Sequence, residues 1–172
     1  GHRIPFVARW PGQVDGGAVC NRLVSLVDLY ATCADIVGED VAGGTVKRGP
    51  DSVSMLPLLT AAEGRPTRAS LVHHSGKGTF AVRTAEWVLI DGPSGGDKPE
   101  PEWFRRERGY EDDDRPRQLF DLGRDIAEAA NLYDEEPQMA AGLLETLEEA
   151  KRRAPSSEGE DGPRPPAEPV SE

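Results

Sequence analysis

The sequence predicts an α/β protein built in two parts and followed by an irregular acidic tail. Residues 1–60 combine one segment of β-forming residues with one long apolar helix pattern. Residues 69–153 combine a run of short strands with a single amphipathic helix. One strand and one helix cannot bury both of their apolar faces alone, so we expect residues 1–60 to belong to the end of a larger α/β domain.

The first part opens with a predicted strand. Residues 4–10 read Ile-Pro-Phe-Val-Ala-Arg-Trp and stop at a Pro-Gly turn. Pro5 cannot donate a ladder hydrogen bond, which places it at an edge or at the entry to a strand. Such a strand needs neighbouring strands, and the rest of residues 1–60 does not contain them.

The strongest helix pattern covers residues 21–38, where apolar residues recur at helical spacing. Asp28 is expected to cap its first turn and Gly38 to end it. We expect Cys33 to lie buried on its apolar face. A further single helical turn is predicted at residues 55–59, which read Met-Leu-Pro-Leu-Leu.

The second part is predicted to be a small antiparallel sheet with one helix packed on it. Short β-forming runs lie at residues 69–74, 79–83, 86–90 and 118–122. The first three are joined by tight turns, which requires antiparallel pairing. Residues 92–116 are expected to be irregular, and residues 137–153 form a helix with Met139, Leu143, Leu144 and Leu147 on one face. Residues 154–172 are rich in Pro, Glu and Ser and are predicted to be disordered.

Composition excludes several classes of function. The net charge of −11 repels a phosphate backbone, which argues against nucleic-acid binding. No stretch approaches the roughly 18 apolar residues of a membrane-spanning helix, so no membrane partner is predicted. The two cysteines, Cys20 and Cys33, do not make a disulfide framework.

Five segments follow one another in an order that carries a family resemblance. Residues 1–12 read Gly-His-Arg-Ile-Pro-Phe-Val-Ala-Arg-Trp-Pro-Gly, residues 24–32 read Val-Ser-Leu-Val-Asp-Leu-Tyr-Ala-Thr, and residues 51–59 read Asp-Ser-Val-Ser-Met-Leu-Pro-Leu-Leu. Residues 81–90 contain Ala-Val-Arg and Glu-Trp-Val-Leu-Ile, and residues 118–132 run from Gln-Leu-Phe-Asp-Leu to Asn-Leu. Together they resemble the C-terminal third of sulfatases of the alkaline-phosphatase-like superfamily, and Val-His-His-Ser at residues 72–75 resembles bacterial arylsulfatase-like proteins.

The resemblance has departures as well. Ala31 stands where the family pattern usually has Pro, Ser52 where it has Gly, and Val88 where it has Lys. Each segment alone is a weak pattern, and the specificity comes from their order over residues 1–153.

What the resemblance implies is metal-assisted hydrolysis of a sulfate ester by a formylglycine nucleophile, with calcium polarising the sulfate oxygens. Neither Cys20 nor Cys33 begins the Cys/Ser-X-Pro/Ala-X-Arg motif from which formylglycine is made. The chain has no Asp-Asn pair, and no Asp-Asp pair near a predicted strand end, to supply calcium ligands. We therefore assign no catalytic residue and no metal ligand to it. Calcium and formylglycine are expected in the parent enzyme, whose N-terminal sulfatase domain is the expected partner.

Three residues are predicted to contact substrate, a sulfated small molecule or a sulfated sugar bound by the parent. His73 and His74 are neighbours on a predicted strand, so they point to opposite faces and do not share one metal ion. One of them is expected either to donate a hydrogen bond to sulfate or a sugar hydroxyl across a domain cleft, or to bond backbone at the strand end. Arg3 is expected to bind either an anion or a structural carboxylate. Trp103, in the long irregular segment, is a candidate for sugar stacking. Because an acidic chain does not attract a sulfated ligand over distance, any contact with such a ligand must be made by local groups of this kind.

Three hypotheses for the chain remain open at this stage. It is the C-terminal part of a sulfatase that is inactive alone, or a stand-alone non-catalytic binding module or remnant derived from such a domain. A third is a related phosphodiesterase or phosphonate hydrolase, because the superfamily shares its fold and the nucleophile decides the chemistry. The family implies a periplasmic or secreted parent.

Overall fold

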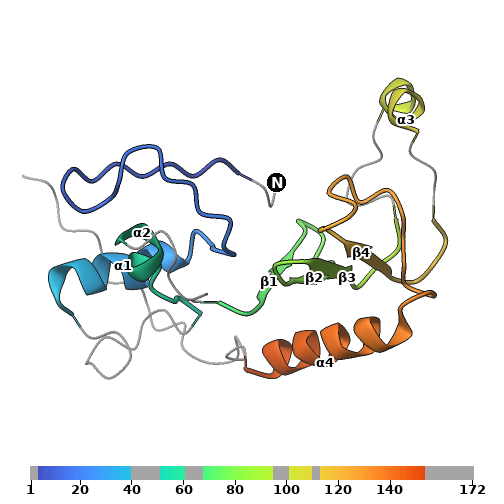
Figure 1. The fold of residues 1–172 in the computed structure, drawn as a ribbon. Helices are drawn as coiled ribbons and strands as arrows, with labels where there is room; N and C mark the ends of the chain where they lie inside the picture. The colour runs from blue at the N-terminus through green and yellow to red at the C-terminus, as the bar shows by residue number, and fades with distance from the viewer. Residues whose placement is uncertain (1–3, 40–50, 61–67, 95–100, 110–112, 154–172) are drawn as a thin grey trace, which may run out of the picture.

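The computed structural model describes residues 4–39, 51–60, 68–94, 101–109 and 113–153. The elements in chain order are α1 (Asp28–Val37), α2 (Leu56–Thr60), β1 (Leu71–His74), β2 (Phe80–Arg83), β3 (Trp87–Ile90), α3 (Glu102–Arg108), β4 (Gln118–Asp121) and α4 (Pro137–Arg153). Helices α1 and α2 lie side by side, and α4 runs along the sheet at the other end of the molecule (Figure 1). This confirms the predicted α/β class with a small antiparallel sheet and a C-terminal helix. The predicted disordered tail, residues 154–172, and Arg3 lie outside the described residues.

The four strands form one antiparallel meander in the order β1-β2-β3-β4. Val72 pairs with Val82, Val82 with Leu89, and Leu89 with Leu119, so one row of apolar side chains crosses the whole sheet. Because strand residues alternate between faces, this register presents one continuous apolar surface to α4. The strands predicted from the sequence are therefore confirmed, with ends that differ by one or two residues.

Helix α4 covers that row and makes the main core. The buried members are Val82, Leu89, Leu119, Ala140, Leu143 and Leu147. Leu144 packs at the margin of this cluster, but Met139 is exposed, so its predicted place on the core face is wrong. Met139 lies in the first turn of α4, and Ala140 takes the core position there. A second cluster of Val88, Phe120 and Leu122 lies on the opposite face of the sheet.

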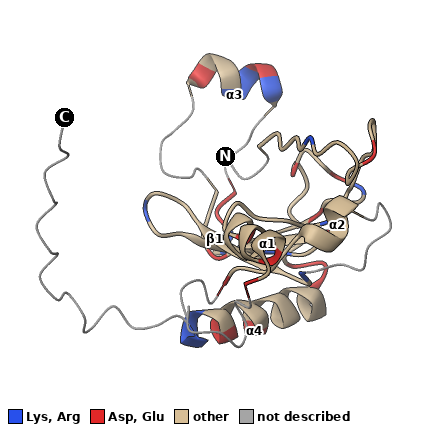
Figure 2. Cartoon of the chain, turned by 90° about the vertical axis from the view of Figure 1, so that its left-hand side faces the viewer, with Lys and Arg blue, Asp and Glu red and all other residues tan. Residues whose placement is uncertain are grey.

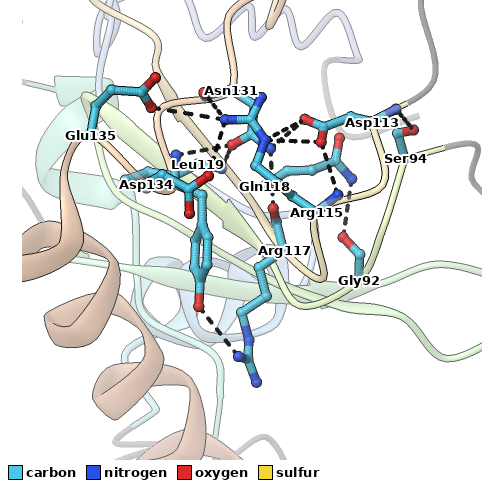
Figure 3. Close-up of polar contacts among 11 residues, drawn as sticks. Gly92, Ser94, Asp113, Arg115, Arg117, Gln118, Leu119, Asn131, Asp134 and Glu135 are labelled. Atoms are coloured by element: carbon cyan, nitrogen blue, oxygen red, sulfur yellow. Dashed lines mark hydrogen bonds and ion pairs between the residues drawn. The ribbon is translucent and has the colours of Figure 1, made fainter.

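A polar clamp around Asn131 fixes the segment that leads from β4 to α4 (Figure 3). Its side-chain oxygen accepts hydrogen bonds from the backbone N–H of Leu119 at 2.9 Å and of Tyr133 at 3.1 Å. Its amide nitrogen donates to Asp113 Oδ2 at 2.6 Å and to the Arg117 carbonyl at 3.1 Å. Asn131 therefore satisfies a backbone donor of a buried strand and makes four contacts in total. This gives a structural reason for the Asn-Leu pair that ends the last family-like segment.

Asp113 and Arg115 complete the clamp. Arg115 Nε donates to Asp113 Oδ1 at 2.9 Å, and Arg115 Nη1 donates to the Asn131 carbonyl at 2.8 Å. Hydrogen bonds from Arg115 and then from Asn131 hold the pKa of the Asp113 carboxyl far below its ordinary value. The carboxylate is thus kept charged, which ties the long β3–β4 connection to the core.

Buried polar groups organise the first part of the chain. The carboxylate of Asp28 is fully buried and accepts hydrogen bonds from the N–H of Ser25 at 2.8 Å and of Val53 at 3.0 Å. Arg68 forms an ion pair with it and also donates to the Asp51 carbonyl at 2.6 Å. The prediction that Asp28 caps the helix is wrong, because Val27 holds the N-cap position without a side-chain bond and the Asp28 carboxylate binds groups outside the helix.

Thr32 and Ser52 join the same two segments. Thr32 Oγ1 donates to the Asp28 carbonyl at 2.6 Å and accepts from the N–H of Met55 at 3.0 Å. Ser52 Oγ donates to the Val27 carbonyl at 2.6 Å and accepts from the N–H of Ala31 at 2.9 Å. Ser52, a departure from the family pattern, therefore supplies two hydrogen bonds through its hydroxyl that glycine, which has no side chain, could not make.

Helix α1 is shorter than predicted at its start and ends as predicted. The N–H of Ser25 is engaged by the Asp28 carboxylate, so residues 21–27 stay outside the helix. Gly38 has φ +79°, a left-handed conformation in which its own N–H and that of Glu39 reach the carbonyls of the last turn. The stop predicted at Gly38 is confirmed.

The apolar stripe of α1 is exposed. The buried residues of α1 are Asp28, Ala31 and Thr32. Cys33 is exposed, so the prediction that it is buried is wrong. Other members of the stripe are also exposed, namely Leu29, Tyr30, Ile36 and Val37. The helix turns its polar side toward residues 51–55 because the Asp28 and Thr32 bonds lie there.

Two further predictions differ from the structure. Residues 4–10 are not a strand in the described structure, since none of the four strands pairs with them and a ladder needs a partner. Residues 102–108, expected to be irregular, form α3, with Glu102 in its first turn, arginines in its last turn and Gly109 at φ +67° after it. These charges suit the helix dipole, and they were visible in the sequence.

Candidate functional site

A cavity of about 410 Å³ lies between the segment that precedes α1 and the first two strands of the sheet. It is lined by Ile4, Phe6, Asn21, Arg22, Leu23, Val24, Ser25, Leu26, Met55, Leu71, His73, Arg83, Thr84 and Ala85. Both parts of the chain contribute to it, so neither part makes it alone. Its volume falls within the range of small-molecule sites.

Strand β1 brings His73 to this cavity and directs His74 away from it. His73 pairs with Ala81, and His74 pairs with Phe80, whose ring packs against the core under α4. The His74 ring lies 5.6 Å from the Phe80 ring, and its Nδ1 lies 2.8 Å from the Ser75 carbonyl. His73 therefore lies on the cavity side, and the backbone-bonded strand-end arrangement weighed from the sequence describes His74.

The lining of the cavity has a cationic character. Arg22 and Arg83 line it together with His73, and none of its lining residues is acidic. Arg83 is half-buried at the end of β2. In a chain of net charge −11, this is a local surface on which an anion is not repelled. The apolar remainder, including Leu23, Met55 and Leu71, suits the nonpolar part of a ligand.

Sequence analysis missed part of this set. Arg22 was not predicted, because its place between Asn21 and an apolar run gives no signal that it faces a cavity. Arg83 was also absent from the predicted ligand-binding residues. Only the tertiary arrangement of residues 21–26 against β1 and β2 brings these side chains into one place.

The described residues do not fit a bound calcium ion. Calcium takes six to eight oxygen ligands, largely carboxylates. Among the described residues no group of three His, Cys, Asp or Glu side chains gathers as a metal site requires. We therefore assign no metal-dependent step to these residues.

In the same described segments, no helix combines the length and the hydropathy that crossing a membrane requires.

Comparison with known proteins gives a consistent result. The chain is 32% identical over 154 residues to an N-acetylgalactosamine-6-O-sulfatase of Bacteroides thetaiotaomicron, a match that covers 89% of this chain and 28% of the relative. It is 33% identical over 153 residues to human arylsulfatase D, covering 80% of this chain and 25% of that protein. The chain thus spans about a quarter of the length of these curated relatives. No family model matches it.

Solved structures agree with the sequence matches. A protein of glycosaminoglycan metabolism from Bacteroides thetaiotaomicron superposes with a TM-score of 0.64 at 28% identity, over 84% of this chain and 28% of that one. A second structure, solved with D-glucosamine-2-N,6-O-disulfate, superposes with a TM-score of 0.55 at 19% identity, which shows a shared fold. The small antiparallel sheet with its helix is common to these neighbours. The order of the five sequence segments, the fold and the extent of the matches show that this chain belongs to the sulfatase family.

Proposed function

We propose that the chain is the C-terminal portion of a sulfuric ester hydrolase and that it completes the fold and forms one wall of the substrate cleft. On this proposal the nucleophile and the metal ligands come from an N-terminal sulfatase domain. The observation that carries the proposal is the uncovered apolar surface of residues 4–37, in a chain that spans 28% of its curated relative. Residues 1–60 then belong to the main α/β domain and residues 69–153 to a C-terminal subdomain.

The segment at residues 4–10 supports this partner. Ile4 and Val7 are exposed, with 51% and 90% of their surface accessible, and Phe6 is also exposed. Apolar residues on both sides of a segment are typical of a strand that is covered on both faces by helices. A sheet in the N-terminal domain would supply the ladder partners that the described residues do not offer.

The exposed stripe of α1 gives a second and independent reason. Leu29, Tyr30 and Ile36 lie at helical spacing, and each has about 40% of its surface accessible. Contiguous apolar surface of this kind marks a protein contact in most soluble proteins. Helix α1 would therefore lie between the α2 side of this chain and the surface of the N-terminal domain.

The cavity is the part of the chain that we propose to contact substrate. The guanidinium groups of Arg22 and Arg83 and the imidazole of His73 can bind a sulfate or a neighbouring anionic group through hydrogen bonds. Sulfated sugars are the substrate class that we favour, because the relatives include a sulfatase named for N-acetylgalactosamine-6-O-sulfate and a fold neighbour solved with a disulfated glucosamine. The formylglycine and the calcium ion of the intact enzyme would come from the N-terminal domain.

A chimera tests the proposal. The matching 154 residues of the Bacteroides N-acetylgalactosamine-6-O-sulfatase are replaced by this chain, and sulfate release from N-acetylgalactosamine 6-sulfate is measured. We expect turnover by the chimera and none by the relative truncated before the replaced segment. The isolated chain should release no sulfate from an aryl sulfate. A cooperatively folding chimera without turnover, or turnover by the isolated chain, would contradict the proposal.

The two adjacent histidines provide a matched pair of variants that tests whether the cavity contacts substrate. In the chimera, His73→Ala should raise KM about tenfold through loss of a hydrogen bond to an anion. His74→Ala removes the same side chain from the face that packs on Phe80 and should leave KM within about twofold. Equal effects of the two variants would remove His73 from the substrate contact.

The stand-alone binding module is the alternative outcome. It requires the isolated chain to cover its own apolar surface, and a dye that binds exposed apolar surface reports this directly. We expect strong dye binding that disappears in the chimera. Weak binding by the isolated chain, together with a cooperative thermal transition over all of its segments, would favour the module.

A further inference from the structure

The fully buried carboxylate of Asp28 holds one wall of the cavity, which residues 21–26 form. Its Oδ2 atom accepts a hydrogen bond from the N–H of Ser25 at 2.8 Å, and Ser25 lines the cavity. Its Oδ1 atom accepts from the N–H of Val53 at 3.0 Å. Arg68 Nε donates to Oδ2 at 3.3 Å, and Arg68 Nη2 donates to Oδ1. Each carboxylate oxygen therefore accepts two hydrogen bonds.

Arg68 connects this carboxylate to the opposite wall of the cavity. It lies just before β1, and β1 contributes Leu71 and His73 to the lining. The side chain of Arg68 is only 12% exposed, and Nη2 also donates to the Asp51 carbonyl at 2.6 Å. An arginine fork that binds both oxygens of a carboxylate fixes a distance and a relative angle together. The ion pair therefore sets how β1 lies relative to the segment that precedes α1.

Two further lining residues are tied to the same ion pair. The N–H of Met55 donates to Thr32 Oγ1 at 3.0 Å, and Thr32 Oγ1 donates to the Asp28 carbonyl at 2.6 Å. Arg83 follows β1 because it pairs with Leu71 in the sheet ladder. Lining residues that are distant in the sequence thus take their relative places from contacts that meet at one carboxylate.

The ion pair is also neutral, which matters beside a site for an anion. Asp and Glu residues occur along much of the described chain (Figure 2). A carboxylate without a cationic partner beside the cavity would weaken the binding of an anion there. Because Arg68 balances the charge of Asp28, the carboxylate can hold the cavity wall without repelling such a ligand.

We propose that Asp28 and Arg68 are positioning residues for the cavity. Their ion pair holds Arg22, on one wall, at a fixed distance from His73 and Arg83, on the other wall. Neither Asp28 nor Arg68 is among the lining residues, so both act through the segments that they join. The choice of a sulfated ligand rests on the proposed function. Loosening the pair should weaken ligand binding and leave the chemical step unchanged, because on that proposal the reacting groups come from the N-terminal domain.

The variant Arg68→Lys tests this role in the sulfatase chimera. Lysine keeps the charge but lacks the planar fork that binds both carboxylate oxygens. We expect KM for N-acetylgalactosamine 6-sulfate to rise about fivefold, with kcat within about twofold. The matched control is Arg117→Lys, which loosens the ion pair of Arg117 with Asp91, at 2.8 Å, in the sheet subdomain. Arg117 is not among the lining residues, so its variant should leave KM within about twofold.

A double-variant cycle distinguishes positioning from a general loss of stability. If Arg68 acts by placing Arg22, its substitution should matter less once the Arg22 guanidinium is gone. In the Arg22→Gln background, Arg68→Lys should therefore raise KM by less than about twofold. The positioning role would be overturned by an unchanged KM in Arg68→Lys, by an equal rise in Arg117→Lys, or by the same fivefold rise in both backgrounds.

Binding of inorganic sulfate to the full chain separates this inference from the proposed function. Sodium sulfate is titrated at constant ionic strength, and the ring resonances of His73, identified by their loss in His73→Ala, report binding. We expect Kd to rise about fivefold in Arg68→Lys and to stay within about twofold in Arg117→Lys.

The two experiments together assign each failure to its cause. Sulfate binding that depends on Arg68, together with a folded but inactive chimera, would refute only the sulfatase role. An active chimera whose KM is unchanged by Arg68→Lys would refute only the positioning role. Absence of sulfate binding to the unchanged chain, together with an inactive chimera, would overturn both.

Discussion

The two parts of this chain differ in how they bury their apolar residues. In the sheet subdomain, Val82, Leu89, Leu119 and Leu147 are all fully buried, because a continuous row of strand residues meets one face of α4. In residues 4–37 most large apolar residues are exposed, and the buried side chains include Asp28 and Thr32. The first arrangement buries its own apolar residues, and the second leaves them exposed.

Different forces therefore hold the two parts together. Burial of apolar area, at about 25 cal/mol per Å², stabilises the sheet subdomain. In the first part, the Asp28–Arg68 ion pair and the Thr32 and Ser52 hydrogen bonds tie α1 to residues 51–55. Such bonds are directional, so they set the orientation of α1 and leave its apolar stripe toward the proposed partner.

The largest expected effect contrasts the two parts directly. Leu147→Ala removes a fully buried side chain from the main core and should lower the free energy of unfolding by about 3 kcal/mol. Leu29→Ala, on the exposed stripe of α1, should change it by less than about 0.5 kcal/mol in the isolated chain. Urea denaturation followed by circular dichroism measures both. In the sulfatase chimera the Leu29 variant should become clearly destabilising, and a neutral result there would argue against the proposed interface.

The next effect concerns the buried ion pair. Asp28→Asn keeps the shape of the side chain but leaves Arg68 without its charged partner, which should cost about 3 kcal/mol. Asp35→Asn, an exposed change on the same helix, is the control and should cost almost nothing. Loss of protection of the residue 51–55 amides in hydrogen exchange would locate the damage. Full protection in the Asp28 variant would show that the Thr32 and Ser52 hydrogen bonds alone hold residues 51–55 against α1.

A smaller effect is expected at the polar clamp of the sheet subdomain. Asn131→Ala leaves the buried N–H of Leu119 and the N–H of Tyr133 without their acceptor, at a cost of about 2 kcal/mol. Asn21→Ala, an exposed asparagine outside the subdomain, serves as the comparison. Thermal unfolding of both variants measures the difference. Equal melting temperatures would mean that water replaces the Asn131 oxygen.

The smallest effect is one of pH. Hydrogen bonds from Arg115 and then Asn131 lower the pKa of Asp113 in the folded chain below its ordinary value of 3.8. The unfolded chain therefore binds the proton more readily, so this stabilisation is complete above the ordinary pKa and is lost as the pH falls below it. Asp113→Asn should flatten the acid-side fall of the unfolding free energy between pH 5 and 3, values set by the ordinary Asp pKa of about 3.9. Asp114→Asn, at the exposed neighbour, should leave the slope unchanged.

Sequence patterns predicted the elements whose partners lie close in the chain. The β-forming runs with tight turns in residues 71–90 and the helix pattern of α4 are local signals, and both elements were confirmed. The strand at residues 4–10 and the burial of Cys33 were wrong for the same reason. On the proposed function, each depends on a surface of the N-terminal domain. The candidate site was predicted only in part: His73 faces the cavity, while Arg22 and Arg83 reach it through tertiary packing.

By itself, the sequence determined the family, the antiparallel sheet and the stop of α1 at Gly38. Residue order, β-forming runs joined by tight turns, and a glycine that can adopt a left-handed conformation are local properties that can be read without knowledge of the fold. Only the tertiary structure decided which histidine faces the cavity, which side of α1 is buried, and that Asp28 binds Arg68 across 40 residues. Those outcomes depend on contacts between distant segments, where buried polar groups must find partners and thereby set the orientation of every apolar face around them.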